Sequence, residues 1–195
     1  LMNADQWRAY ANSKSLETST YDLYGADTDW FDEMTRTGVS QNHSVSMSGG
    51  GSKSNYRASF SYLDRNGIMR DNAMERYSFR FQFSQRAIND RLRIGLTGSA
   101  TLTDNQVPNG DNFVLAYSML PVYPVFNEDG TYFTKVNKEY DQGNPVQNQD
   151  LNTMKNKMNY FYANGDVQFL LMEGLNVKAN LYKSRFNGEF SQYTH

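Results

Sequence analysis

The chain has 195 residues, a formal net charge of −2 and no cysteine, so disulfides, thiolate metal sites and cysteine nucleophiles are excluded. The near-neutral charge gives no attraction to nucleic acid, and no stretch approaches the roughly 18 apolar residues of a membrane-spanning helix. Aromatic residues make up 14% of the chain, a content typical of a transmembrane β-barrel with aromatic girdles. The chain starts at Leu1 without a visible signal peptide, which indicates an internal piece of a longer protein.

Residues 1–41 are polar and mixed, and they predict a loop with a short helix. Asn3 is placed to cap a helix start, with Gln6 three positions later. An ordered loop is expected over residues 21–37, with one helical turn near 30–36. Four carboxylates in this loop lack the spacing of an EF-hand, so a solvated acidic loop is favoured over a calcium site. They are Asp27, Asp29, Asp32 and Glu33.

Six later stretches alternate between apolar and polar residues, the pattern of a two-faced β-strand. In Tyr77-Ser78-Phe79-Arg80-Phe81-Gln82-Phe83-Ser84 every odd position is aromatic and every even one is polar. Strands are predicted at residues 42–49, 55–63, 76–85, 91–103, 158–171 and 175–182. Such strands suit a transmembrane β-barrel, but they also suit a soluble antiparallel sheet.

The lengths of the connections favour the barrel. Short turns are predicted near residues 50, 89 and 173, a longer loop near 70, and a very long one over 104–157 that holds all 4 prolines. Outer-membrane barrels have tight periplasmic turns and long outer loops. We therefore expect residues 1–41 and 105–157 to form extracellular loops, 42–104 to form four barrel strands, and 158–195 to form two more.

A set of ordered motifs resembles the early barrel of SusC/RagA-family TonB-dependent outer-membrane transporters. The motifs are Leu1-Met2-Asn3-Ala4-Asp5-Gln6-Trp7, Thr28-Asp29-Trp30-Phe31-Asp32-Glu33, Ser40-Gln41-Asn42-His43, Ser48-Gly49-Gly50, Tyr56-Arg57-Ala58-Ser59, Gly67-Ile68 and Glu75-Arg76-Tyr77. The run Tyr123-Pro124 to Asp129-Gly130 also resembles a loop element of that family, and Asp129-Gly130 predicts a hairpin turn. The resemblance covers about residues 1–105 and weakens beyond them.

The resemblance implies an all-β fold: an antiparallel meander that is part of a 22-stranded transmembrane barrel with long extracellular loops. It implies import of a large solute, a glycan oligosaccharide or a peptide, across the outer membrane of a Gram-negative, Bacteroidetes-like bacterium. The implied partners are a SusD-like surface lipoprotein, a plug domain of the same parent chain, TonB and outer-membrane lipid. No cofactor and no nucleic acid are implied.

Two groups of residues are candidates for contacts with other molecules. Charges on the polar face of the strands are expected to line the lumen, where they are either solvated or paired with the plug or solute: Arg57, Arg80, Arg93, Asp166 and Lys178. Loop residues are expected to touch the solute or the lipoprotein, with loop packing as the alternative role of the aromatic ones: Trp30, Phe31, Asn109, Asp111, Tyr117, Tyr123 and Tyr132.

No catalytic or metal-ligating constellation is visible, since the only histidines are His43 and His195 and no phosphate-binding glycine motif occurs. We therefore expect a protein that is not an enzyme. The alternative to the transporter is a soluble cell-surface β domain that binds carbohydrate. That alternative requires the aromatic faces of strands 76–85 and 91–103 to pack together in a dry core.

Overall fold

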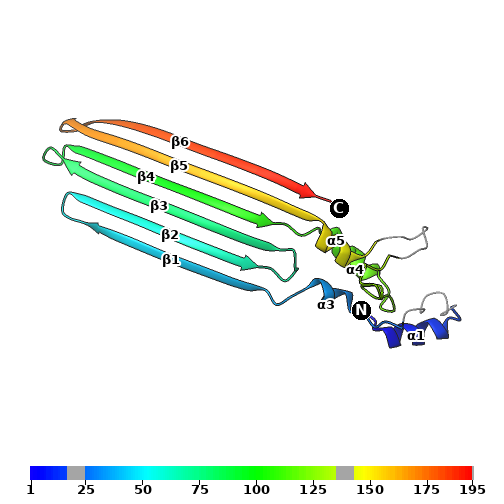
Figure 1. Ribbon diagram of the computed structural model, residues 1–195. Coiled ribbons are helices and arrows are strands. Elements are labelled where there is room, and N and C mark those ends of the chain that lie inside the picture. The colour runs from blue at the N-terminus through cyan, green and yellow to red at the C-terminus, as the bar shows by residue number, and fades with distance from the viewer. Residues whose placement is uncertain (17–24, 135–142, 195) are drawn as a thin grey trace.

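The protein folds into one long antiparallel sheet with a small helical cap at one end (Figure 1). The computed structural model describes residues 1–16, 25–134 and 143–194. The sheet has six strands in the order β1-β2-β3-β4-β5-β6, so each strand pairs with its neighbours in sequence. Their bounds are β1 Val39–Gly50, β2 Ser54–Asn66, β3 Ala73–Ala87, β4 Leu92–Gln106, β5 Thr153–Met172 and β6 Leu175–Tyr193. The predicted antiparallel meander is confirmed.

The connections lie at two opposite ends of the sheet according to their length. The turns after β1, β3 and β5 are short and lie at the end that we call the hairpin end (Figure 1). The chain between β2 and β3 and the long segment between β4 and β5 lie at the other end, with the N-terminal segment. In the first short turn, a Cβ added at Gly50 would collide with the Ser54 carbonyl oxygen, so the tight reversal needs glycine there.

The strands are longer than the sequence predicts at several ends. β1 begins at Val39 instead of residue 42, β5 begins at Thr153 instead of 158, and β6 continues to Tyr193 instead of ending at 182. Ladder pairing continues through these ends. In the extension of β6 the large apolar residues change face, because Phe186 and Phe190 lie opposite to the face of Leu181, so the alternation that marks the strand in the sequence is interrupted there.

Among the described residues, four short helices lie at the cap end. They are α1 Ala4–Ser13, α3 Trp30–Met34, α4 Asp111–Ser118 and α5 Pro145–Leu151. The predicted capping box of α1 is present: the Asn3 side chain accepts from Gln6 N, and the Gln6 side chain accepts from Asn3 N. The predicted turn at Asp129-Gly130 closes a small hairpin with a bridge between Phe126 and Tyr132. Part of the loop predicted over 21–37 lies outside the described residues.

The buried apolar core lies entirely in this cap. We define the cap as the described residues of 1–38, 67–72 and 107–152. Its core brings together side chains from all three segments: Ala4, Trp7, Ala11, Trp30, Met34, Met69, Ala116, Val122, Tyr123, Val125, Phe133 and Val146. None of these residues belongs to a strand. Among the described residues, no helix combines the length and apolar character needed to cross a membrane.

Candidate functional site

One face of the sheet is apolar over most of its width and is not covered by any other part of the described chain. Register places Val45, Phe60, Phe79, Ala100 and Phe161 side by side in one row across β1 to β5. The large side chains on this face are exposed or half-buried, Val45 being exposed at 65% for example and Phe81 half-buried. A contiguous apolar face of this size marks a surface that contacts protein or lipid.

The apolar band runs obliquely to the strands. The row that begins at Val45 on β1 reaches the charged Arg185 on β6. On this face of β6 the aliphatic side chains lie nearer the hairpin end, and the last of them, Leu181, is in the row of Gly49. Strands of a closed barrel tilt by about 35–45° to its axis. An apolar band of constant height on tilted strands produces this displacement.

Aromatic and charged residues mark the cap-end border of the band. Tyr62 and Tyr77 pair across β2 and β3 with ring centroids 4.9 Å apart. The next row towards the cap is charged, with Asp64, Glu75 and Asp104 on neighbouring strands. Going from the apolar band towards the cap, tyrosine rings come first and charged side chains next, which is the order found where a membrane meets water.

The opposite face is mostly polar over β1 to β4, and the five predicted charges all lie on this opposite face. On β5 and β6 the same face also carries aromatic side chains: Tyr160, Tyr162, Tyr182, Phe186 and Phe190. Arg57 lies between Ser48 and Gln82, and Arg80 lies between Ser59 and Ser99. Arg57 and Arg80, together with Gln82, Thr97 and Tyr162, line a hollow of about 430 Å³. Arg93, Asp166 and Lys178 lie on the same face nearer the hairpin end.

The predicted loop residues divide into buried and accessible ones. Trp30 is only 2% exposed and donates its indole N–H to the Leu120 carbonyl at 3.0 Å, and Tyr123 is only 4% exposed. Both side chains therefore pack in the cap core, which is the alternative role given above for the aromatic loop residues. Tyr117 is 70% exposed, Asp111 is also exposed, and Asn109 is half-buried.

Accessible aromatics gather at a cleft of about 450 Å³ between α1, α3 and α4. Phe31 and Tyr117 line it, as do the carboxylates of Asp27 and Asp29. Phe31 packs against Phe113 with ring centroids 5.6 Å apart. Within the described ranges, no group of three or more metal-ligating side chains converges. Asp29 caps α3 through bonds from Phe31 N and Asp32 N, and Asp27 accepts from Ala4 N.

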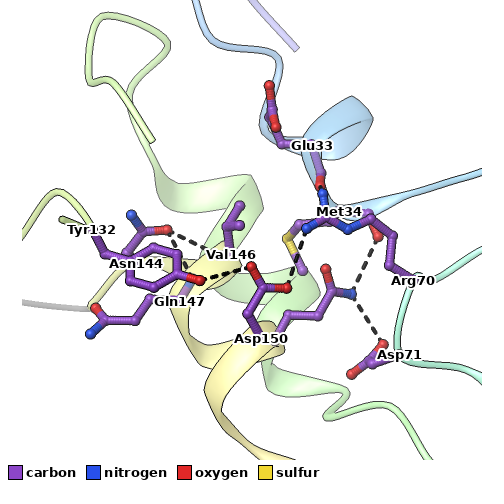
Figure 2. A network of polar contacts seen from close by, with 10 residues as sticks. Glu33, Met34, Arg70, Asp71, Tyr132, Asn144, Val146, Gln147 and Asp150 are labelled. Carbon is purple, nitrogen blue, oxygen red and sulfur yellow. Dashed lines mark hydrogen bonds and ion pairs between the residues drawn. The ribbon is translucent and has the colours of Figure 1, made fainter. Parts of the chain in front are cut away.

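A polar network ties the segments of the cap together, and sequence reasoning missed it (Figure 2). Arg70, in the β2–β3 connection, donates to the Glu33 carbonyl at 2.6 Å and to the Asp150 carboxylate at 3.2 Å. The Tyr132 hydroxyl donates to the other Asp150 oxygen at 3.0 Å. Gln149 donates to the Met34 carbonyl and to Asp71. The only local signal of this arrangement is Asn144-Pro145, a cap followed by proline at the first helical position.

The Tyr132–Asp150 contact predicts a loss of cap stability at alkaline pH. Burial, and then the hydrogen bond and charge of Asp150, raise the pKa of Tyr132 above its ordinary value. A raised pKa means that the protonated hydroxyl stabilises the folded cap below the ordinary tyrosine pKa, and that this contribution is lost as pH rises through the folded pKa. Hydrogen exchange of residues 143–152 should therefore accelerate at alkaline pH more in wild type than in Tyr132→Phe. Equal acceleration in both would contradict the prediction.

Comparison with known proteins shows similarity to transporters and receptors, although no family model matches the chain. It is 28% identical to the TonB-dependent receptor SusC of Bacteroides thetaiotaomicron over 217 aligned positions, which cover all of this chain and 21% of the relative. It is 28% identical to the TonB-dependent receptor P26 of Formosa agariphila, covering 91% of this chain and 18% of the relative. The chain thus spans about a fifth of the length of these relatives.

Solved structures share the fold. The RagAB peptide importer in its closed-closed state superposes with a TM-score of 0.67 at 23% identity, over 85% of this chain and 20% of the other. Its open-open state superposes with a TM-score of 0.66 at 24% identity, over 94% of this chain and 22% of the other.

Proposed function

We propose that this chain, which is SusC/RagA-like, forms a sector of the barrel wall of a TonB-dependent importer in the outer membrane. The observation that carries the proposal is the uncovered, oblique apolar band on a meander whose long connections all lie at one end. A lipid bilayer is the environment that matches such a band, because in a closed barrel every strand has its backbone paired while its outer side chains meet hydrocarbon. The parent protein would have 22 strands around a plug domain.

The exposed apolar face of the sheet also disfavours the alternative, a soluble cell-surface β domain that binds carbohydrate. That alternative requires the face of β3 and β4 that carries the β3 aromatic residues to pack in a dry core, but the two strands are neighbours in one sheet and present Phe79 and Leu96 on one exposed face. In water this exposed area would drive aggregation.

In the proposed orientation the cap faces outside and meets the solute and a SusD-like lipoprotein. The residues placed for such contacts are the accessible ones around the cleft and on α4, chiefly Phe31, Tyr117 and Asp111. Asn109 and Tyr132 are half-buried and would contribute at most their exposed edges. The solute would be a glycan oligosaccharide or a peptide, with transport energised through TonB and no chemical step on the solute.

Surface labelling of the full-length parent tests the topology. An epitope inserted between Glu128 and Asp129, in the exposed tip of the cap hairpin, should be labelled on intact cells, with the protein in the outer-membrane fraction. The same epitope in the turn at residues 51–53, at the hairpin end, should be labelled only after the outer membrane is permeabilised. Labelling of the 51–53 site on intact cells, or recovery of the protein in a soluble fraction, would overturn the proposal.

A further inference from the structure

The apolar face of the sheet is lowest over a group of small residues on β4 and β5. Register places Gly98 beside Ala163, and Gly165 follows on the same face of β5, beside Leu96. Larger side chains surround these three positions on the same face: Phe81, Phe161, Val167 and Leu181. Because the neighbours are larger, the backbone comes nearest to the surface at Gly98, Ala163 and Gly165, which we call the small-residue patch.

The two glycines of the small-residue patch are not required by the packing of the described chain. A Cβ added at Gly98 would lie 3.7 Å from the Tyr162 carbonyl oxygen, and one added at Gly165 would lie 3.4 Å from Cδ2 of Leu96. Both are ordinary contact distances, and neither glycine has a positive φ. Glycine inside a strand weakens it and often marks a place where a ligand or another backbone comes close. The patch therefore points to an occupant from outside the described chain.

Two cations lie on the apolar face next to the patch, where the apolar band gives way to polar residues. Lys183 is paired with Ala163, and Arg185 is paired with Phe161, one row nearer the cap. The other same-face positions around the two cations carry no charge: Leu181, Asn159 and Asn187. Within the described chain no ion pair engages either cation, and the only hydrogen bond of the Arg185 guanidinium goes to the Asn187 side chain at 3.3 Å. Both cations are therefore available to an anion.

The acids of the apolar face lie two rows nearer the cap than Arg185, in the row that contains Lys157. Asp104 is 3.9 Å from Lys157, which is paired with Glu189 in the register. Together with Glu75 and Arg185, these residues line a hollow of about 980 Å³. Carboxylates accept hydrogen bonds from hydroxyl groups, so the hollow suits a headgroup that carries hydroxyls as well as an anionic group.

We propose that the apolar face of β4–β6 binds one phosphorylated glycolipid at a fixed site, with an acyl chain over the small-residue patch and a phosphate on Lys183 and Arg185. The proposal rests on the proposed function, in which the apolar face meets the lipid bilayer. An unbranched acyl chain fits against residues that are shorter than their neighbours. The planar arginine fork matches two phosphate oxygens, and a lysine at the edge of the hydrocarbon extends its amine to the headgroups. The sugar hydroxyls would then reach the carboxylates of the hollow.

Native mass spectrometry of the full-length protein in detergent tests the site, with diphosphoryl lipid A as the glycolipid. Wild type should retain one tightly bound lipid A, and monophosphoryl lipid A should bind more weakly. Lys183→Gln/Arg185→Gln should weaken the binding of diphosphoryl lipid A about tenfold, because two cations near the headgroups are lost. Arg76→Gln/Arg86→Gln is the matched control, since it removes the same charge from the polar face of β3 and should bind like wild type.

A second pair of variants tests the acyl-chain contact without changing the charge. Gly98→Leu/Gly165→Leu fills the small-residue patch, so it should also weaken the binding of lipid A while the heat-dependent gel shift of a folded barrel is retained. Ala58→Leu adds a similar side chain to the same face on β2, outside the patch, and should bind like wild type.

The outcomes separate the glycolipid from other occupants of this face. Wild-type binding by either Lys183→Gln/Arg185→Gln or Gly98→Leu/Gly165→Leu would overturn the proposal. Displacement of lipid A by an equal concentration of inorganic phosphate would show that the cations take a free anion, and it would overturn the lipid assignment. Loss of association between copies of the protein in Lys183→Gln/Arg185→Gln, with lipid binding unchanged, would assign the face to a second copy instead. Each of these outcomes leaves the protein in the outer membrane, whereas failure of wild type to reach that membrane would refute the proposed function itself.

Discussion

Replacing Leu96 with arginine is expected to prevent stable insertion of the parent protein in the outer membrane. Leu96 lies on β4 in the middle of the apolar band, between Phe83 and Gly165 on the neighbouring strands, and is 45% exposed. An arginine at the mid-plane of a lipid-facing barrel surface costs about 2–4 kcal/mol. The measurement is the urea concentration at the midpoint of unfolding in lipid vesicles. The folded fraction at each urea concentration is read from the change in gel mobility that folded barrels show on heating.

The neighbouring residue on the other face provides the control. Thr97 lies between Gln82 and Asn164 on the polar face. Thr97→Arg makes a similar change of size and charge one position along the same strand, and it should leave the midpoint close to that of wild type. Equal destabilisation by the two substitutions would show that the apolar face does not meet lipid.

Truncation of Trp30 to alanine is expected to open the cap while leaving the sheet intact. Removing a buried aromatic side chain costs about 3–5 kcal/mol, and here the Leu120 carbonyl also loses its indole donor. The cap core contains few large side chains, so this loss is a large share of its stability. Limited proteolysis of the protein in membranes should cleave residues 107–134 faster in the variant, with the barrel gel shift retained.

Tyr117→Ala is the control for Trp30→Ala, because it removes an aromatic side chain that is not packed in the cap core. Tyr117 is on the neighbouring helix α4 but is 70% exposed, so its truncation should leave the cleavage rate near that of wild type. Loss of the barrel gel shift in Trp30→Ala would mean that the sheet depends on the cap for its own stability, contrary to the separation described above.

The sheet was predictable because its signal is local. Alternation with a period of two fixes which residues of one strand share a face. Residues paired across neighbouring antiparallel strands lie on the same face, so the assignment extends over the whole sheet. This is why Arg57, Arg80, Arg93, Asp166 and Lys178 were placed on one face from the sequence alone.

The cap was not predictable in the same way because its contacts are remote in sequence. Trp30 meets Leu120, and Gln149 meets Met34, with separations of 90 and 115 residues. An aromatic residue in a polar loop looks the same in the sequence whether it packs inward, as Trp30 and Tyr123 do, or stays accessible, as Tyr117 does. An apolar run in a long connection, such as residues 113–126, indicates that the connection is ordered, but it does not indicate which segments it packs against.

The location of the core also sets the order of assembly. Residues 4–34 and 116–146 are separated in the chain by β1 to β4, so closing the cap before those strands pair would cost the entropy of a long loop. Pairing the strands first carries the distant segments to the same end of the sheet and removes most of that cost. The cap should therefore close last, and its resistance to protease would report that the strands beneath it have paired in their correct register.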